Sequence, residues 1–96
     1  MNEKAAIDKG SDQLFQYLDT YVQGALIGVR KSKATGQVFY ELESIARVFG
    51  CYSFHDLMLK DETINQVFRV QYPKALETGW MEESEMKSLQ LLPAVF

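Results

Sequence analysis

Apolar residues recur every three or four positions in the early part of the chain, at Leu14, Leu18, Tyr21, Val22 and Ala25. This spacing is typical of an amphipathic helix. Ser11 stands where an N-cap is needed, and Asp12 follows it as a first-turn acid that complements the helix dipole. The pattern predicts a helix over residues 12–25. Residues 1–10 have no apolar period and are expected to form a flexible lead-in.

The pattern changes at residues 26–30 and again at residues 37–40. Both stretches are rich in β-branched or aromatic residues, and they flank the polar turn KSKATG. Short apolar runs around a turn that contains glycine are typical of a β-hairpin. The sequence therefore predicts two short strands with a basic tip between them.

A helical period returns directly after this hairpin, with Leu42, Ile45, Ala46 and Phe49 on one face. Gly50 stands where a left-handed residue would end the helix. Ser53, followed three residues later by Asp56, is a capping-box pattern and predicts a second short helix over residues 53–60.

The remaining third of the chain repeats these signals. Thr63 and Gln66 predict the start of another helix, which Pro73 forces to end at Tyr72. Pro73 can itself open a single turn, and the acids of residues 82–85 favour the start of a last helix that Pro93 ends. The expected fold is α+β: four or five short helices packed around a two-stranded β-hairpin, in a single globular domain over residues 11–96.

Composition places the chain among globular proteins. Of its 96 residues 47% are hydrophobic, and they are spread along the chain rather than gathered into the run of about 20 that a membrane span needs. The N-terminus has no signal-peptide pattern, so we expect a cytoplasmic protein without membrane contact. Cys51 is the only cysteine and His55 the only histidine, which excludes an internal disulfide and a structural zinc. We expect neither a metal nor a cofactor.

Charge weighs against nonspecific binding to nucleic acid, because such binding depends on phosphate neutralisation by Lys and Arg. The formal net charge is −3 and the pI is near 5.0. However, Arg30, Lys31 and Lys33 fall within four positions. A basic face could therefore coexist with an acidic one, although both could equally be solvated surface.

Two short helices around a glycine carry the main functional signal. The segment IARVFG followed by a second amphipathic turn resembles a DNA-binding helix-turn-helix, in which alanine permits close helix packing and glycine permits the turn. Asp56 occupies a position that is apolar in that motif, and no Arg or Asn lies on the second helix to read bases. The alternative is a pair of packed helices without any DNA contact.

A wider window, about residues 27–60, resembles the N-terminal Bro-type domain of phage antirepressors. IGVR, a polar turn and GQVFYELESIARVFGCYSFHDL follow the same order of strand, turn, aromatic-rich strand and helix. The resemblance implies a mixed helix-and-sheet domain of phage or mobile-element origin that acts in transcription regulation. The candidate residues for contact with duplex DNA are Arg30, Lys31, Lys33, Arg47, Ser53, His55 and Lys60.

No enzyme signature emerges from the chain. GVRKSKATG lacks the spacing of a phosphate-binding loop, and Ser53, His55 and Asp56 are neighbours along the chain, which does not align them for proton relay. Cys51 has no flanking base and is expected to be an inert thiol. We expect a non-enzymatic protein with no small-molecule substrate.

The second open function is a protein-interaction module, such as an inhibitor or adaptor, with no DNA contact. Tyrosines are frequent, and the C-terminal LQLLPAVF is unusually apolar for a chain end. The candidate interface residues, which would also support a homodimer, are Tyr17, Tyr21, Leu91, Leu92, Val95 and Phe96. The alternative is that the C-terminal residues dock on their own core.

Overall fold

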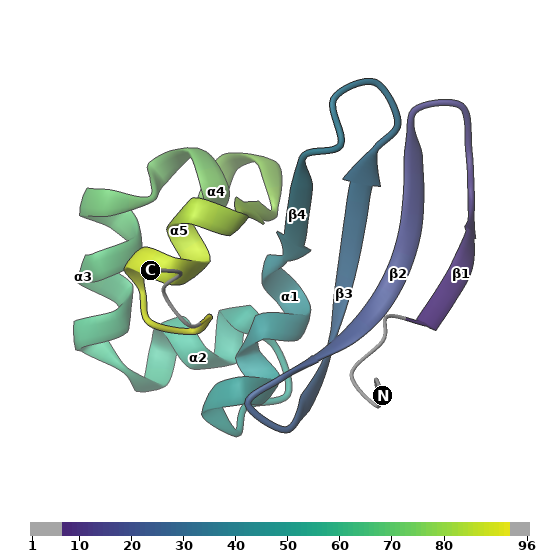
Figure 1. Cartoon of the computed structure of the whole chain (residues 1–96). Helices are drawn as coiled ribbons and strands as arrows, with labels where there is room; N and C mark the ends of the chain where they lie inside the picture. The colour runs from purple at the N-terminus through teal and green to yellow at the C-terminus, as the bar shows by residue number, and fades with distance from the viewer. Residues whose placement is uncertain (1–6, 93–96) are drawn as a thin grey trace.

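A five-stranded antiparallel sheet forms one half of the molecule, and short helices form the other (Figure 1). The computed structural model describes residues 7–92. The strands pair in chain order and are β1 (Ile7–Ser11), β2 (Phe15–Val22), β3 (Ala25–Ser32), β4 (Val38–Glu41) and β5 (Trp80–Glu82). Helices separate β4 from β5 in the sequence, so the last strand returns to the sheet from the helical half.

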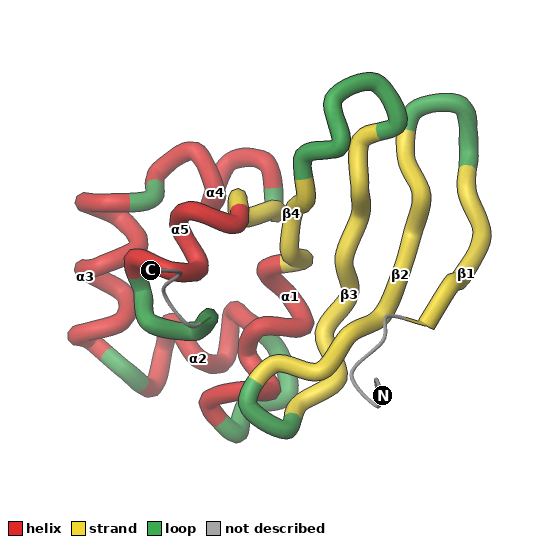
Figure 2. Tube along the Cα trace, viewed as in Figure 1, coloured by secondary structure: helices red, strands yellow, loops and turns green. Residues whose placement is uncertain are grey.

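The helical half lies beside β4 and β5, as the tube in Figure 2 makes plain. Its elements are α1 (Leu42–Ile45), the 3₁₀ turn η1 (Ala46–Phe49), α2 (Phe54–Lys60), α3 (Glu62–Gln71), α4 (Pro73–Thr78) and α5 (Glu83–Ser88). α5 contacts both β4 and β5, so the last helix is held against the sheet.

The expected architecture is wrong, because residues 12–25 form no helix. Phe15–Val22 is the strand β2, and residues 7–10 of the predicted lead-in belong to β1, which pairs with it. Asp12 does not start a helix; its carboxylate accepts hydrogen bonds from the backbone N–H groups of Leu14 and Phe15, which is the geometry of a turn. The segment FQYLDTYV is rich in aromatic and β-branched residues, and that preference prevails over the helical spacing of a few apolar residues.

The connection between β2 and β3 is a two-residue hairpin loop. Gln23 has a φ of 50° and Gly24 a φ of 86°, and positive values at both positions are those of a type I′ turn. The Gln23 side chain also donates to the backbone carbonyls of Gln90 and Leu91. The turn thus ties the sheet to the segment that follows α5.

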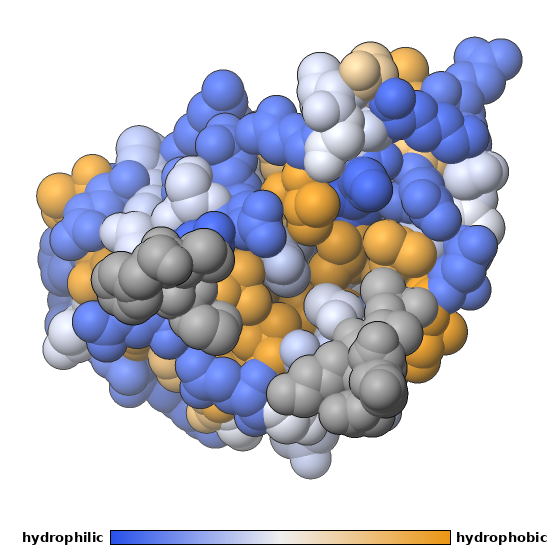
Figure 3. Space-filling model, in the orientation of Figure 1, coloured by the Kyte–Doolittle hydropathy of each residue, from blue (hydrophilic) through white to orange (hydrophobic). Residues whose placement is uncertain are grey.

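Side chains alternate between the two faces of the sheet, as the pleat requires. One face supplies Val22, Ile27, Val29, Tyr40 and Met81 to the core. The helical half contributes Ile45, Phe68 and Met86, which are fully buried, and the Phe54 and Phe68 rings meet edge to face with centroids 4.9 Å apart. On the side shown in Figure 3, hydrophobic residues gather in the hollow between the sheet and the helices.

Most of the predicted helix ends agree with the structure. Gly50 ends η1 with a φ of 77°, and the Ser53 side chain accepts the backbone N–H of Asp56 at 3.0 Å at the start of α2. Asp61, not Thr63, caps α3. The last helix ends at Ser88, short of the predicted Pro93, and β5 was not expected because a three-residue strand carries no periodicity.

Substitution of Gly50 by valine should lower the free energy of unfolding by about 1 kcal/mol or more. A Cβ at this position would meet no atom within 4 Å, so the cost is backbone strain alone and not a steric clash. Gly50→Asn is the matched control, since asparagine tolerates left-handed geometry and should cost less. Urea unfolding of the three proteins measures the difference, and equal midpoints for glycine and valine would contradict the expectation.

Candidate functional site

Arg30 lies among aromatic rings on the sheet face opposite the core. Its guanidinium carbon is 4.2 Å from the centroid of the Phe15 ring and 4.2 Å from that of Trp80. The Phe39 ring is 5.5 Å away. These distances are those of cation–π contacts, and they hold the planar guanidinium in one orientation.

The strand register explains how residues so far apart in the sequence meet. Tyr17 pairs with Arg30 across β2 and β3, Arg30 pairs with Phe39 across β3 and β4, and Phe39 pairs with Glu82 of β5. Directly paired residues of an antiparallel sheet share a face. We call the set Phe15, Tyr17, Arg30, Phe39 and Trp80 the aromatic face; each of its members is half-buried.

Arg30 has no charged partner among residues 7–92. The ion pairs in this range join Lys9 to Asp19 and Lys60 to Asp56. The Nε atom of Arg30 is buried and makes no hydrogen bond within the described part of the chain. A buried polar atom without a partner costs free energy, which offsets part of the stabilisation from the cation–π contacts.

A pocket of about 300 Å³ opens beside Arg30, where the aromatic face meets α4. Its lining comes from β3, β4, β5, α4, α5 and the β3–β4 turn, namely Arg30, Gln37, Phe39, Lys74, Ala75, Thr78, Trp80, Glu82 and Glu85. Phe39 and Trp80 are its aromatic members, and six of the nine lining residues are polar or charged. A concave site where several polar groups converge beside aromatic rings is a candidate binding site.

The two carboxylates that line this pocket already have backbone partners. The Glu82 side chain accepts from the backbone N–H of Glu85, and the Glu85 carboxylate accepts the Glu82 N–H at 2.9 Å. This reciprocal capping box starts α5. Both acids are therefore held at the helix end and make no ion pair with Arg30.

The N-terminal end of β2 is positioned by the carboxylate of Asp12. It accepts the backbone N–H groups of Leu14 and Phe15 at 2.9 and 2.8 Å, and the hydroxyl of Tyr17 at 2.9 Å. The hydrogen bond from the Phe15 N–H is the largest cause that lowers the pKa of Asp12, and the bond from the Tyr17 hydroxyl is the next. The bond between Tyr17 and Asp12 in turn raises the pKa of Tyr17. Asp12 thus orients two members of the aromatic face.

Gly28 marks the far boundary of the site. A Cβ at this position would lie 2.7 Å from the Oε1 atom of Glu41, so the absence of a side chain lets Glu41 lie across the strand. The Gly28 N–H donates to the Ser44 hydroxyl at 2.9 Å. This contact joins β3 to α1 where β4 no longer pairs with it.

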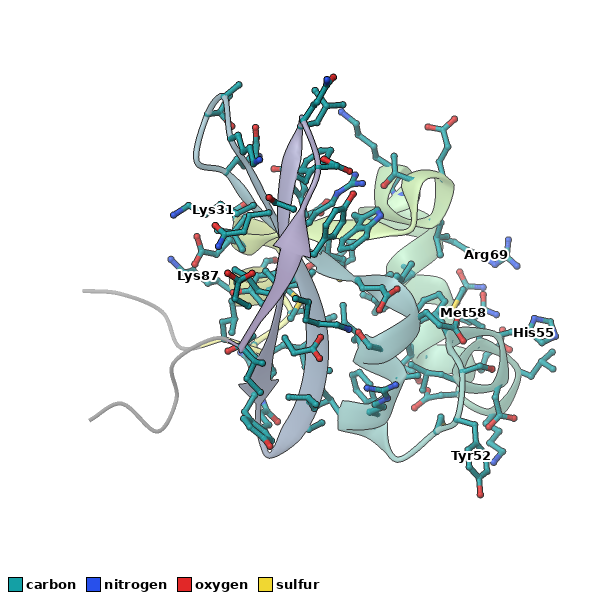
Figure 4. The ribbon with its side chains drawn as sticks, turned by 90° about the vertical axis from the view of Figure 1, so that its right-hand side faces the viewer. Lys31, Tyr52, His55, Met58, Arg69 and Lys87 are labelled. Carbon is teal, nitrogen blue, oxygen red and sulfur yellow. The ribbon has the colours of Figure 1, made fainter. Side chains whose placement is uncertain are left out.

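Of the candidate DNA-contact residues, only Arg30 belongs to this site. Lys31 lies on the opposite face of β3, and in Figure 4, seen from the β1 side, it points away from His55. Lys33 donates to the Ser11 hydroxyl, and Arg47 donates to the carbonyl of Leu26 at 2.8 Å. Ser53 caps α2, Lys60 pairs with Asp56, and His55 is exposed. These residues do not converge on one face.

The candidate interface residues are also dispersed. Leu91 is buried in the core and Leu92 packs against it. Tyr17 belongs to the aromatic face, and Tyr21, which is 53% exposed, lies further along the same strand. Val95 and Phe96 lie outside the described residues.

The candidate site residues predicted from the sequence do not include Phe15, Phe39, Lys74 or Trp80. The available signal was the alternation in FQYLDTYV, where Phe15, Tyr17 and Tyr21 share one face of a strand while Leu18 and Val22 share the other. No local pattern brings Lys74 or Trp80 to this place, because the return of β5 to the sheet depends on tertiary packing.

Residues 7–92 offer neither a metal site nor a membrane-spanning helix. In this range no three His, Cys, Asp or Glu side chains are grouped so as to hold a metal ion, and no helix is long and apolar enough to cross a membrane. Comparisons with protein-family models, curated proteins and solved structures return no match to this chain.

Replacement of Asp12 by alanine should destabilise the protein at neutral pH and have little effect in strong acid. The folded-state pKa of Asp12 is lowered, so its contribution is present above the unfolded value of about 3.9 and is lost as the pH falls through the folded pKa. Unfolding free energies of both proteins between neutral and acidic pH measure this. Tyr17→Phe, which removes one of the three donors, should show a smaller difference; a gap independent of pH would contradict the assignment.

Proposed function

We propose that this protein is a non-enzymatic interaction module that docks a protein partner on the aromatic face. The observation that carries the proposal is the arrangement of Arg30, which is clamped between Phe15 and Trp80 beside an open pocket and has no ion partner in residues 7–92. Arginine, tyrosine and tryptophan are the residue types that dominate binding energy at protein interfaces.

The arrangement favours a protein over a single-stranded nucleic acid. Bases bind by stacking on free aromatic surfaces, whereas Arg30 already covers the Phe15 and Trp80 rings. Nucleic acid also requires several phosphate-neutralising cations, but the pocket offers Arg30 and Lys74 together with Glu82 and Glu85. Aromatic residues and arginine are the types enriched at the centres of protein interfaces.

Regulation at duplex DNA stays a prediction and is the second candidate. It is favoured by one observation: η1 ends at a left-handed Gly50 and α2 follows with a proper cap, which is the order that the helix-turn-helix resemblance needs. The dispersal of the cations weakens it, because a nucleic-acid surface requires contiguous positive potential. Phage or mobile-element origin and homodimer formation stay predictions as well.

A random peptide library displayed on phage tests the proposal directly. Panning against the wild-type protein should enrich peptides that lose binding to Arg30→Met and keep it to Lys31→Met. The two variants each remove one positive charge, from neighbouring residues on opposite faces of β3. They differ in that Arg30 belongs to the aromatic face and Lys31 does not. NMR shifts caused by an enriched peptide should map to β2, β3, β4 and β5.

Arg30→Met should also fold, with a free energy of unfolding within about 1 kcal/mol of wild type. The substitution removes stabilising cation–π contacts, but it also removes a buried nitrogen whose missing hydrogen bond is destabilising. Peptides that bind both variants equally, or shifts confined to α2 and the exposed Tyr52, would overturn the aromatic face as the docking site. Salt-dependent binding of duplex DNA without any peptide enrichment would favour the second candidate.

A further inference from the structure

We infer that the pocket beside Arg30 receives the carboxylate of an aspartate or glutamate side chain of the partner protein. The inference rests on the proposed function, because it names the chemical group that the aromatic face recognises. It does not follow from the aromatic rings alone, which would serve any apolar partner.

The guanidinium of Arg30 is prepared for this group. Arginine presents its N–H donors in a rigid plane that matches both oxygens of a carboxylate. Phe15 and Trp80 fix that plane at 4.2 Å from each ring centroid. Little side-chain freedom remains to be lost on binding, which is the condition under which a charged hydrogen bond adds most to affinity.

Three other polar side chains surround the same space. Lys74 and Thr78 come from α4, and Gln37 comes from the turn before β4. Gln37 and Lys74 can donate hydrogen bonds to an anion, and Lys74 adds a second positive charge. The Thr78 hydroxyl already donates to the carbonyl of Trp80 at 3.3 Å. Lys74 and Thr78 belong to the helical half and Arg30 to the sheet, so a ligand in the pocket would contact both halves of the molecule.

Two glutamates line the pocket, and neither makes an ion pair with Arg30. In their capping box the Glu85 carboxylate accepts the N–H of Glu82 at the end of β5, and the Glu82 carboxylate accepts the N–H of Glu85 in α5. The guanidinium is thus kept free of internal carboxylates although two of them lie in the same pocket. An arginine left unpaired in this way is available to an external carboxylate.

The surroundings favour a side-chain carboxylate over a chain terminus. Capture of a terminal carboxylate uses free backbone N–H groups, but at the pocket wall the N–H of Trp80 donates to the Thr78 hydroxyl and that of Gln37 to the Thr35 hydroxyl. The pocket volume of about 300 Å³ is at the lower limit for ligand sites, which suits one side chain.

NMR titration with end-blocked single amino acids tests the inference without any partner. N-acetyl-glutamate amide, whose only carboxylate is that of the side chain, should shift the Arg30 Nε–H signal and the Trp80 indole signal with a Kd in the range of about 1–10 mM. The neutral N-acetyl-glutamine amide should shift neither. Two further probes represent the competing ligands. N-acetyl-glycine represents a chain-terminal carboxylate, and inorganic phosphate represents the anion of a nucleic acid.

Three variants of the full chain locate the site. Arg30→Lys keeps the charge but loses the planar fork, so binding should weaken about tenfold. Lys74→Met should weaken it about threefold, whereas Lys87→Met, which removes a cation that lies with Lys31 on the other side of the molecule, should not change it. The expected order is therefore wild type and Lys87→Met first, then Lys74→Met, then Arg30→Lys.

Several results would overturn the inference. These are the absence of shifts up to about 50 mM glutamate probe, equal shifts by the glutamine probe, and tighter binding of phosphate or N-acetyl-glycine. If Lys87→Met weakened binding of the glutamate probe as much as Lys74→Met does, the attraction would come from the overall charge of the protein and not from this site. The proposed function is judged separately by the enriched peptides: peptides that require Arg30 but contain no acidic residue would uphold the docking face and reject the carboxylate.

Discussion

The register between β2 and β3 is the constraint on which both the core and the candidate site depend. These strands pair over eight residues on each side, from Phe15 with Ser32 to Val22 with Ala25, and the turn at Gln23 and Gly24 closes the hairpin. Because side chains alternate with a period of two, a slip of one residue would move Val29 out of the core and turn Arg30 into it. Burial of the hydrophobic face therefore fixes the register, and the register places Arg30 on the opposite face of the sheet.

The same alternation separates residues that are adjacent in the sequence. Arg30 and Lys31 form part of one basic cluster along the chain, but the pleat sends their side chains to opposite faces. Conversely, Phe15, Arg30, Phe39 and Trp80 are scattered along the sequence and come together because four strands pair side by side. A charge cluster in a strand is therefore a poor guide to a surface, whereas cross-strand pairing is a good one.

Local signals in the sequence predicted those elements whose structure has a local cause. Gly50, Ser53 and Pro73 act on their own backbone, so the ends of η1, α2 and α3 could be anticipated. The error over residues 12–25 arose because Leu14, Leu18 and Val22 fit a helical spacing as well as a strand, and only pairing with β1 and β3 decides between them. β5 and the pocket depend on contacts between distant segments, and no short pattern encodes them.

The pocket also joins the parts of the fold that are least supported by pairing. β5 is three residues long and pairs only with β4, and α4 and α5, which it connects, are six residues each. Short elements at a sheet edge open more readily than a paired interior. A ligand that contacts Arg30 on β3 and Lys74 on α4 binds only when these elements are in place, so it stabilises them by mass action. Recognition at this site would therefore strengthen the junction between the sheet and the helical half.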